Sequence, residues 1–159
     1  LKVGHRNIYE LLREVQHQSK LLARAYMRSE QYEKAEDICL RIRDMTKAIY
    51  KEETYTPPLH LEQSMYRYLA ICSLKKHDEE KAISYLEEMY DYVLGQAEGF
   101  QKIRYVKTPL LESYELDFNY PTYEPKKLLL QELERECFKT LADYPRFLQL
   151  KEKVSQLSD

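Results

Sequence analysis

The sequence predicts an all-α fold, and three observations support this. Only 3 of the 159 residues are glycine, whereas Leu, Glu, Lys, Arg, Ala and Gln, which favour helices, are abundant. Apolar residues recur at three- and four-residue spacing along most of the chain. One pattern also occurs twice, at a separation of 47 residues. The matched pairs are Leu22 and Leu69, Ala23 and Ala70, and Ala35 and Ala82.

The composition predicts one soluble domain with a single core, residues 1–159. Hydrophobic residues make up 43% of the chain and charged residues 33%, which is typical of globular proteins. A net charge of -2 does not favour binding to nucleic acid or to an anionic membrane. No signal peptide or membrane-length apolar run is visible, and the three cysteines lack CxxC spacing. We therefore expect a cytoplasmic protein with reduced, buried thiols and, because the first residue is Leu, a fragment of a longer chain.

Apolar spacing predicts two helical hairpins in the first part of the chain. The first hairpin, residues 7–49, has helices at 7–28 and 32–49, and the second, residues 59–94, has helices at 59–75 and 79–94. Gly95 and Gly99 are expected to end the fourth helix. Leu22, Met45 and Cys137 are among the expected core residues.

The rest of the chain is predicted to be less regular at first and then helical again. An irregular Tyr-rich segment, residues 98–123, is expected to hold one short helix at 109–114. A C-terminal hairpin, residues 124–157, follows, with a long helix over 125–144 and a last helix from Pro145.

The repeated pattern predicts stacked helical pairs, because one pair alone cannot bury its apolar face. Leu22-Ala23-x-x-Tyr26, followed by Ala35, resembles the signature of the tetratricopeptide repeat. The second copy has Ser73 where the first has Tyr26, and the period of 47 residues exceeds the family's repeat of about 34. The resemblance implies a right-handed array of antiparallel helical hairpins.

A second resemblance concerns the order of three segments, "MYRYLAICSLKKHDEEKAISYLEEMYDY", "RYVKTPLLESYELDF" and "KKLLLQELERECFKTLADYPRFLQLKEKV". This order resembles the C-terminal region of bacterial XRE-type transcription regulators, which carry a lambda-repressor-like helix-turn-helix domain ahead of helical repeats. The resemblance covers residues 59–154. It implies a sensor or oligomerisation domain that meets DNA only through a separate N-terminal domain outside this chain.

The sequence contains no motif for a metal, a cofactor or catalysis. HExxH, CxxC, GxGxxG and GxxxxGK[ST] are absent, and the four histidines fall on separate elements. We therefore expect no metal, no cofactor and no enzymatic activity. A Cys–His centre stays open as a distant alternative, and it would show a lowered thiol pKa.

The candidate binding groove is a stripe of cations on the first helix of each hairpin, where a helical array lines its concave side. Positive charge beside an aromatic residue would suit an acidic peptide or a terminal carboxylate, and the alternative is an ordinary solvated helix face. Alanine at both Arg24 and Arg67 is expected to weaken such a ligand with little change in melting temperature. The candidate residues are His17, Lys20, Arg24, Arg28, Arg67, Tyr68, Ile71 and Lys75.

Tyrosine is in excess, with 15 residues, and several aromatic residues fall in the irregular segment. They could form a binding wall or a dimer contact, or they could pack the segment onto the helices. These residues are Phe100, Tyr105, Tyr114, Phe118, Tyr120 and Tyr123.

The interpretation that follows is an interaction, sensor or oligomerisation domain of a bacterial transcription regulator. Its partner would be a protein, a peptide or a second copy of the chain. The alternative is a stand-alone helical-repeat adaptor with no link to transcription.

Overall fold

The computed structural model describes residues 1–53, 56–59, 61–102, 106–115 and 124–158. Within these ranges the chain forms helices and no strand, which confirms the all-α class. None of the described helices is long and apolar enough to cross a membrane. The elements are α1 (Lys2–Arg28), α2 (Tyr32–Tyr50), α3 (Gln63–Lys75), α4 (Glu79–Lys102), α5 (Pro125–Leu133), the 3-10 helix η1 (Glu136–Leu141) and α6 (Pro145–Ser155).

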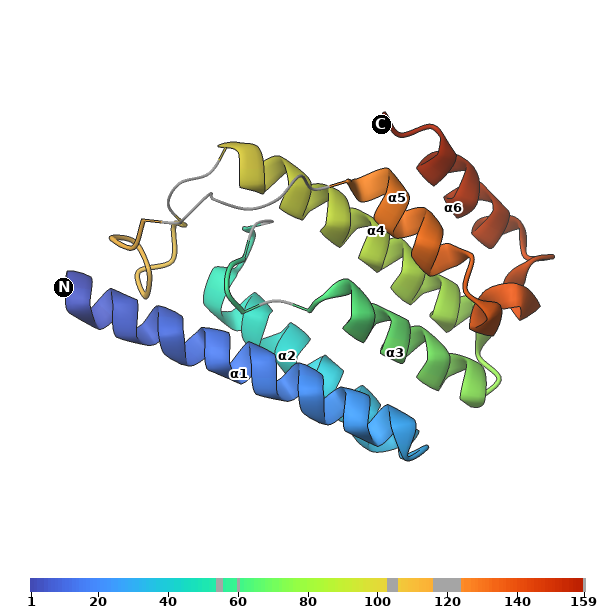
Figure 1. Cartoon of the computed structure of the whole chain (residues 1–159), viewed down its shortest axis with the longest axis horizontal. Helices are drawn as coiled ribbons and strands as arrows, with labels where there is room; N and C mark the ends of the chain where they lie inside the picture. Colours follow the sequence, from blue (N-terminus) through green and yellow to red (C-terminus); the bar gives the residue numbers. More distant parts are fainter. Residues whose placement is uncertain (54–55, 60, 103–105, 116–123, 159) are drawn as a thin grey trace.

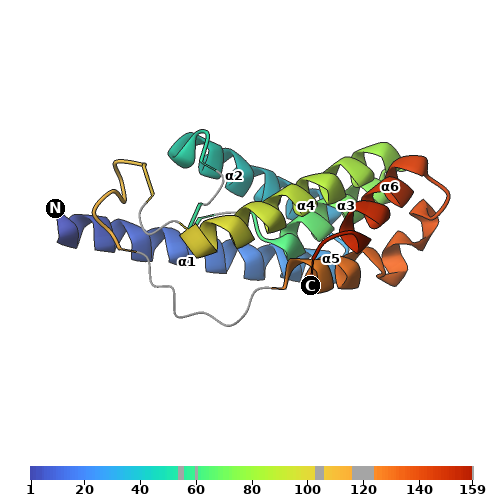
Figure 2. The ribbon, with the colours of Figure 1, turned by 90° about the horizontal axis from the view of Figure 1, so that it is seen from above.

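Each α-helix packs against the next one along the chain, and α1 also contacts α3 (Figure 1). The pair α1 and α2 lies at one end of the molecule, and α5 and α6 lie at the other. Seen from above, α1 and α5 run along one side and α2 along the opposite side (Figure 2). The first, third and fifth helices thus contribute to one common face. The finer, tetratricopeptide-like arrangement stays a prediction.

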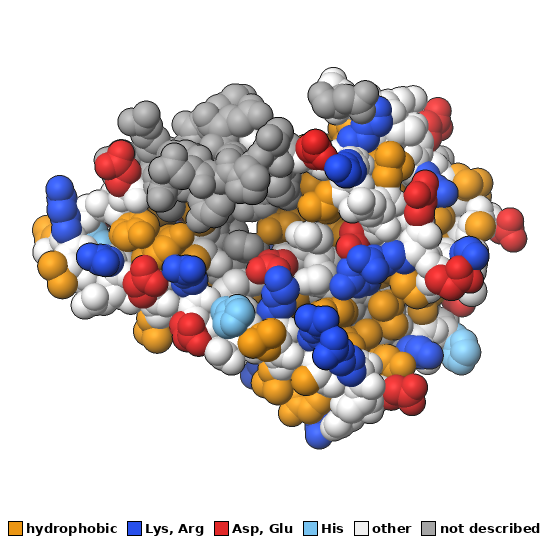
Figure 3. Space-filling view, viewed as in Figure 1, with side chains coloured by type: hydrophobic (Ala, Val, Ile, Leu, Met, Phe, Trp, Pro, Cys, Tyr) orange, Lys and Arg blue, Asp and Glu red, His pale blue; other side chains and the backbone are white. Residues whose placement is uncertain are grey.

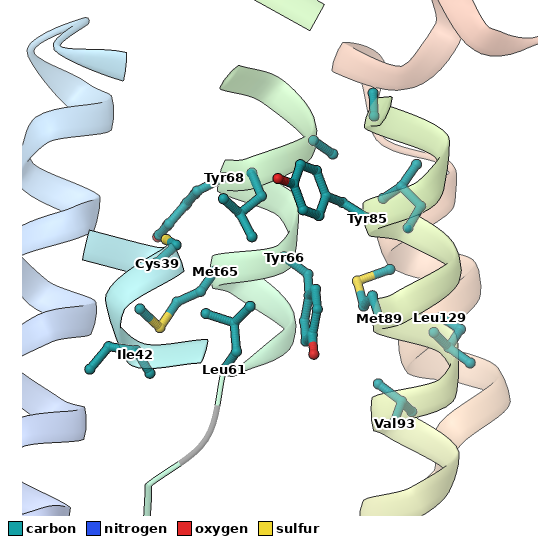
Figure 4. Close-up of a cluster of buried hydrophobic side chains, with 14 of the residues drawn as sticks. Cys39, Ile42, Leu61, Met65, Tyr66, Tyr68, Tyr85, Met89, Val93 and Leu129 are labelled. Atoms are coloured by element: carbon teal, nitrogen blue, oxygen red, sulfur yellow. The ribbon is translucent and has the colours of Figure 1, made fainter. Parts of the chain in front are cut away.

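The repeated alanines lie where the helices meet. Ala23, Ala35, Ala70 and Ala82 are completely buried, as expected for small residues that let two helices approach closely. Larger side chains fill the space around them. Figure 4 shows part of this core, in which residues of α3 such as Met65 face α2, and Met89 of α4 lies on the other side of α3.

Three helix boundaries differ from the prediction. The first helix begins at Lys2 rather than at residue 7, and the third begins at Gln63 rather than at residue 59. The fourth helix continues to Lys102, through both glycines that were expected to end it. Glycine weakens a helix by only about 1 kcal/mol. Burial of Val93 and Gln96 extends the packed face of α4 far enough to offset that cost.

The C-terminal part also corrects two predictions. Residues 109–114 form turns rather than a short helix, with Leu111 N–H bonded to Thr108 O and Tyr114 N–H bonded to Leu111 O. The helix expected over 125–144 ends at Leu133, because Arg135 adopts an extended backbone with ψ 144°. The tighter η1 that follows turns Phe138 inward.

Three residues expected in the core are exposed instead. The exposed fraction is 48% for Leu22, which lines an open hollow between α1 and α2, and 40% for Met45. Cys137 is exposed because the residues that η1 directs into the core are Phe138 and Leu141.

Candidate functional site

The predicted cations lie on the face that α1, α3 and α5 share. Figure 3 shows Lys and Arg side chains gathered over the middle of this face, with apolar surface between them. We call it the basic face and define it by His17, Lys20, Arg24, Arg28, Arg67, Lys75 and Arg135. An ion pair joins Lys20 of α1 to Glu62 at the start of α3, with 2.6 Å between Nζ and Oε2. A second ion pair joins α3 to α5.

Arg67 and Arg135 hold one carboxylate between them. Nη1 of Arg67 donates to both carboxylate oxygens of Glu132, at 2.7 and 2.8 Å. Nε and Nη2 of Arg135 donate to the same oxygens, at 2.8 and 2.9 Å. The Glu132 side chain is only 8% exposed and that of Arg67 18%, so this cluster is a structural clamp between α3 and α5. Two guanidinium groups on one carboxylate leave one positive charge in excess.

The hydrogen bond with Glu132 also raises the pKa of Arg135, although burial of the guanidinium acts in the opposite direction. Arg135 therefore keeps its positive charge at any physiological pH. Arg67 lies over the ring of Tyr68, 5.4 Å from its centroid, which fixes the guanidinium further.

Three cations of α1, unlike the arginines of the clamp, have no partner among the described residues. His17, Arg24 and Arg28 are exposed, and none of them makes an ion pair or a hydrogen bond with a residue in the described part of the chain. Arg24 and Arg28 are four residues apart, so their side chains leave the same side of α1. These two guanidinium groups are available to a ligand.

The remaining predicted residues divide between core and face. Tyr68 is 6% exposed and packs in the core, so it offers little aromatic surface to a ligand. Ile71 is half-buried, and Lys75 is exposed with its Nζ 5.3 Å from the centroid of the Tyr32 ring. Ile71 therefore supplies apolar surface and Lys75 a further cation.

Part of the Tyr-rich segment lies against α1. The ring of Tyr114 stacks on that of Tyr9, with 4.2 Å between centroids and an angle of 15°. The backbone N–H of Ser113 donates to Nδ1 of His5 at 3.3 Å, and its hydroxyl also contacts that nitrogen. This confirms packing onto the helices for Tyr114. Tyr105, Tyr120, Tyr123 and Phe118, and the side chain of Phe100, lie outside the described residues.

The thiols do not have the environment of a catalytic nucleophile. Burial raises the pKa of Cys39 to about 12 and that of Cys72 to about 11, whereas a reactive thiol needs a lowered pKa. Burial also raises the pKa of Cys137, although nearby Arg67 and Arg135 act in the opposite direction. Within the described residues, no group of three or more His, Cys, Asp or Glu could hold a metal ion.

Sequence reasoning missed Glu62, Glu132 and Arg135. The last two are three residues apart and form an ion pair across the end of α5, so this local contact could have been proposed from their spacing. The contact of Glu132 with Arg67 spans 65 residues, so nothing in the local sequence indicates it.

Comparisons with known proteins add no relative: no family model, no curated protein and no solved structure matches this chain.

Proposed function

We propose that this chain is a protein-interaction domain that binds an acidic peptide segment on the basic face. The observation that carries the proposal is the state of Arg24 and Arg28, which are exposed and unpaired with any described residue. Two of the carboxylates nearby, Glu62 and Glu132, are already engaged by Lys20, Arg67 and Arg135. The face therefore carries an excess of positive charge that its nearest acids do not balance.

The proposed ligand follows from this pattern. Guanidinium groups bind carboxylates through two parallel hydrogen bonds, which makes Asp and Glu side chains or a terminal carboxylate suitable partners. From His17 to Arg28 the stripe of cations extends about 16 Å along α1. Ile71 is half-buried on α3, four residues after Arg67, and would accept an apolar side chain of the same peptide. Catalysis is not part of the proposal.

A selection from random peptides of about 12 residues, displayed on phage, tests this function. We expect the bound peptides to be enriched in Asp and Glu and to be lost when Arg24→Ala and Arg28→Ala are combined. The matched control is Lys47→Ala combined with Lys81→Ala, which removes two positive charges from exposed positions of α2 and α4. Enrichment of neutral or basic peptides, or equal loss in the control, would contradict the proposal.

The cellular setting is a separate proposal that depends on the resemblance to XRE-type regulators. In that setting, peptide binding would bias an attached helix-turn-helix domain between two arrangements. Sequencing the reading frame upstream of the codon for Leu1 tests it. A helix-turn-helix domain in frame would support the regulator, and an unrelated domain or a nearby start codon would favour the adaptor.

A further inference from the structure

The two ends of the molecule leave apolar surface uncovered. At the first end, Leu11 of α1 is 64% exposed, Leu22 of α1 48% and Met45 of α2 40%. Between α1 and α2 lies a hollow of about 380 Å³, lined by Leu22, Tyr26 and Ile38 together with Glu33, Lys34 and Asp37. An apolar patch that borders a hollow is a surface suited to contact with another molecule.

The opposite end has a hollow of its own. It measures about 210 Å³ and lies between the end of α5, η1 and the start of α6. Phe147 and Leu148 contribute apolar surface to it, and Leu148 is 52% exposed. The charged residues of its lining are Glu134, Arg135, Lys139 and Lys151.

The charged side chains that line the two hollows have opposite net charge. The first has two acids and one base, and the second has one acid and three bases. Even with Arg135 engaged by Glu132, two lysines face one glutamate at the second hollow. The ion pairs of Arg41 with Asp37 and of Lys139 with Glu136 are exposed, so they are weak and can exchange for pairs between molecules.

We propose that a second copy of this chain binds head to tail, with the α1–α2 end of one molecule on the α5–α6 end of the next. Contact between two first ends would bring acid-rich hollows together, and contact between two second ends would bring basic hollows together. Only the head-to-tail contact buries Leu22 and Leu148 and also pairs opposite charges. Such a contact is heterologous, so each bound copy leaves one further end open.

Sedimentation velocity with two variants of the whole chain tests this proposal. Leu22→Glu disables the first end and Leu148→Glu the second, and both residues are exposed, so the fold should be retained. Leu110→Glu is the matched control, because Leu110 is 40% exposed and lines neither of the two hollows. Circular dichroism and the melting temperature of each variant check that it is folded.

The expected result has three parts. The wild type and Leu110→Glu associate with increasing concentration, and each end variant alone is monomeric. An equal mixture of the two end variants forms a dimer, because one intact first end meets one intact second end. The proposal is overturned if the wild type is monomeric up to about 1 mM, where even weak association is visible. It is also overturned if only one variant prevents association, or if the mixture stays monomeric.

Discussion

The arginines of α1 and those at the α3–α5 contact lie on the same face of the molecule but in opposite surroundings. Arg67 is largely buried and shares a buried carboxylate with Arg135. Arg24 and Arg28 extend from α1 into solvent and have no partner among the described residues. The difference shows that a stripe of like residues can serve two purposes, since one part holds helices together and the other is left for a ligand.

The largest loss of stability should come from Arg67→Ala. This change leaves Glu132 buried with one guanidinium instead of two, so we expect the free energy of unfolding to fall by about 2–3 kcal/mol. Urea denaturation measures it, with Lys75→Ala on the same helix as an exposed control. A loss below about 0.5 kcal/mol would mean that the clamp adds no stability. Because Arg67 holds a buried carboxylate, we expect Arg24→Ala combined with Arg67→Ala to lower the melting temperature, in contrast to the expectation from the sequence alone.

The three thiols should differ in reactivity according to their exposure, because Cys137 is exposed whereas Cys39 and Cys72 are buried. At about pH 8, a thiol whose pKa is raised from 9.0 to about 11 has roughly 100-fold less thiolate, and Cys39 is affected more strongly. We expect iodoacetamide to modify the exposed Cys137 first. Cys39 and Cys72 should react only as the pH approaches their raised pKa values or when the protein unfolds. Peptide mass mapping after a short reaction would reveal any contrary order.

A smaller loss of stability is expected when the contact between the segment 106–115 and α1 is weakened. Tyr114→Ala removes the stacking on Tyr9, which should cost about 1 kcal/mol. Limited proteolysis should then cleave near Ser113 sooner, because the segment is held less firmly to α1. Tyr114→Phe keeps the ring and serves as the control. Equal cleavage of all three proteins would show that the stacking does not anchor the segment.

The smallest effect on stability should come from Arg24→Ala combined with Arg28→Ala. Both side chains are exposed and unpaired with described residues, so the free energy of unfolding should change by less than about 0.5 kcal/mol. Urea denaturation beside the Arg67→Ala variant makes the contrast direct. A large loss would mean that the α1 cations have a structural purpose too.

The sequence was sufficient for the helical class and for the alanines at the helix contacts, because both depend on local spacing. The sequence was insufficient where contacts between distant residues determine a helix boundary or an ion pair. The long α4 depends on burial that offsets two glycines, and α5 ends at Leu133 because Arg135, held by Glu132, adopts an extended backbone. The clamp on Glu132 depends on a contact across 65 residues.

The central claim is that Arg24 and Arg28 bind an acidic ligand while Arg67 serves the fold. Isothermal titration of one selected acidic peptide tests it most directly, with the wild type, the Arg24→Ala/Arg28→Ala variant and the Lys47→Ala/Lys81→Ala control. We predict that the first variant binds at least about 10-fold more weakly, from the loss of two charge-assisted contacts, at an unchanged melting temperature. The control should bind like the wild type. Equal affinity in all three proteins would contradict the claim.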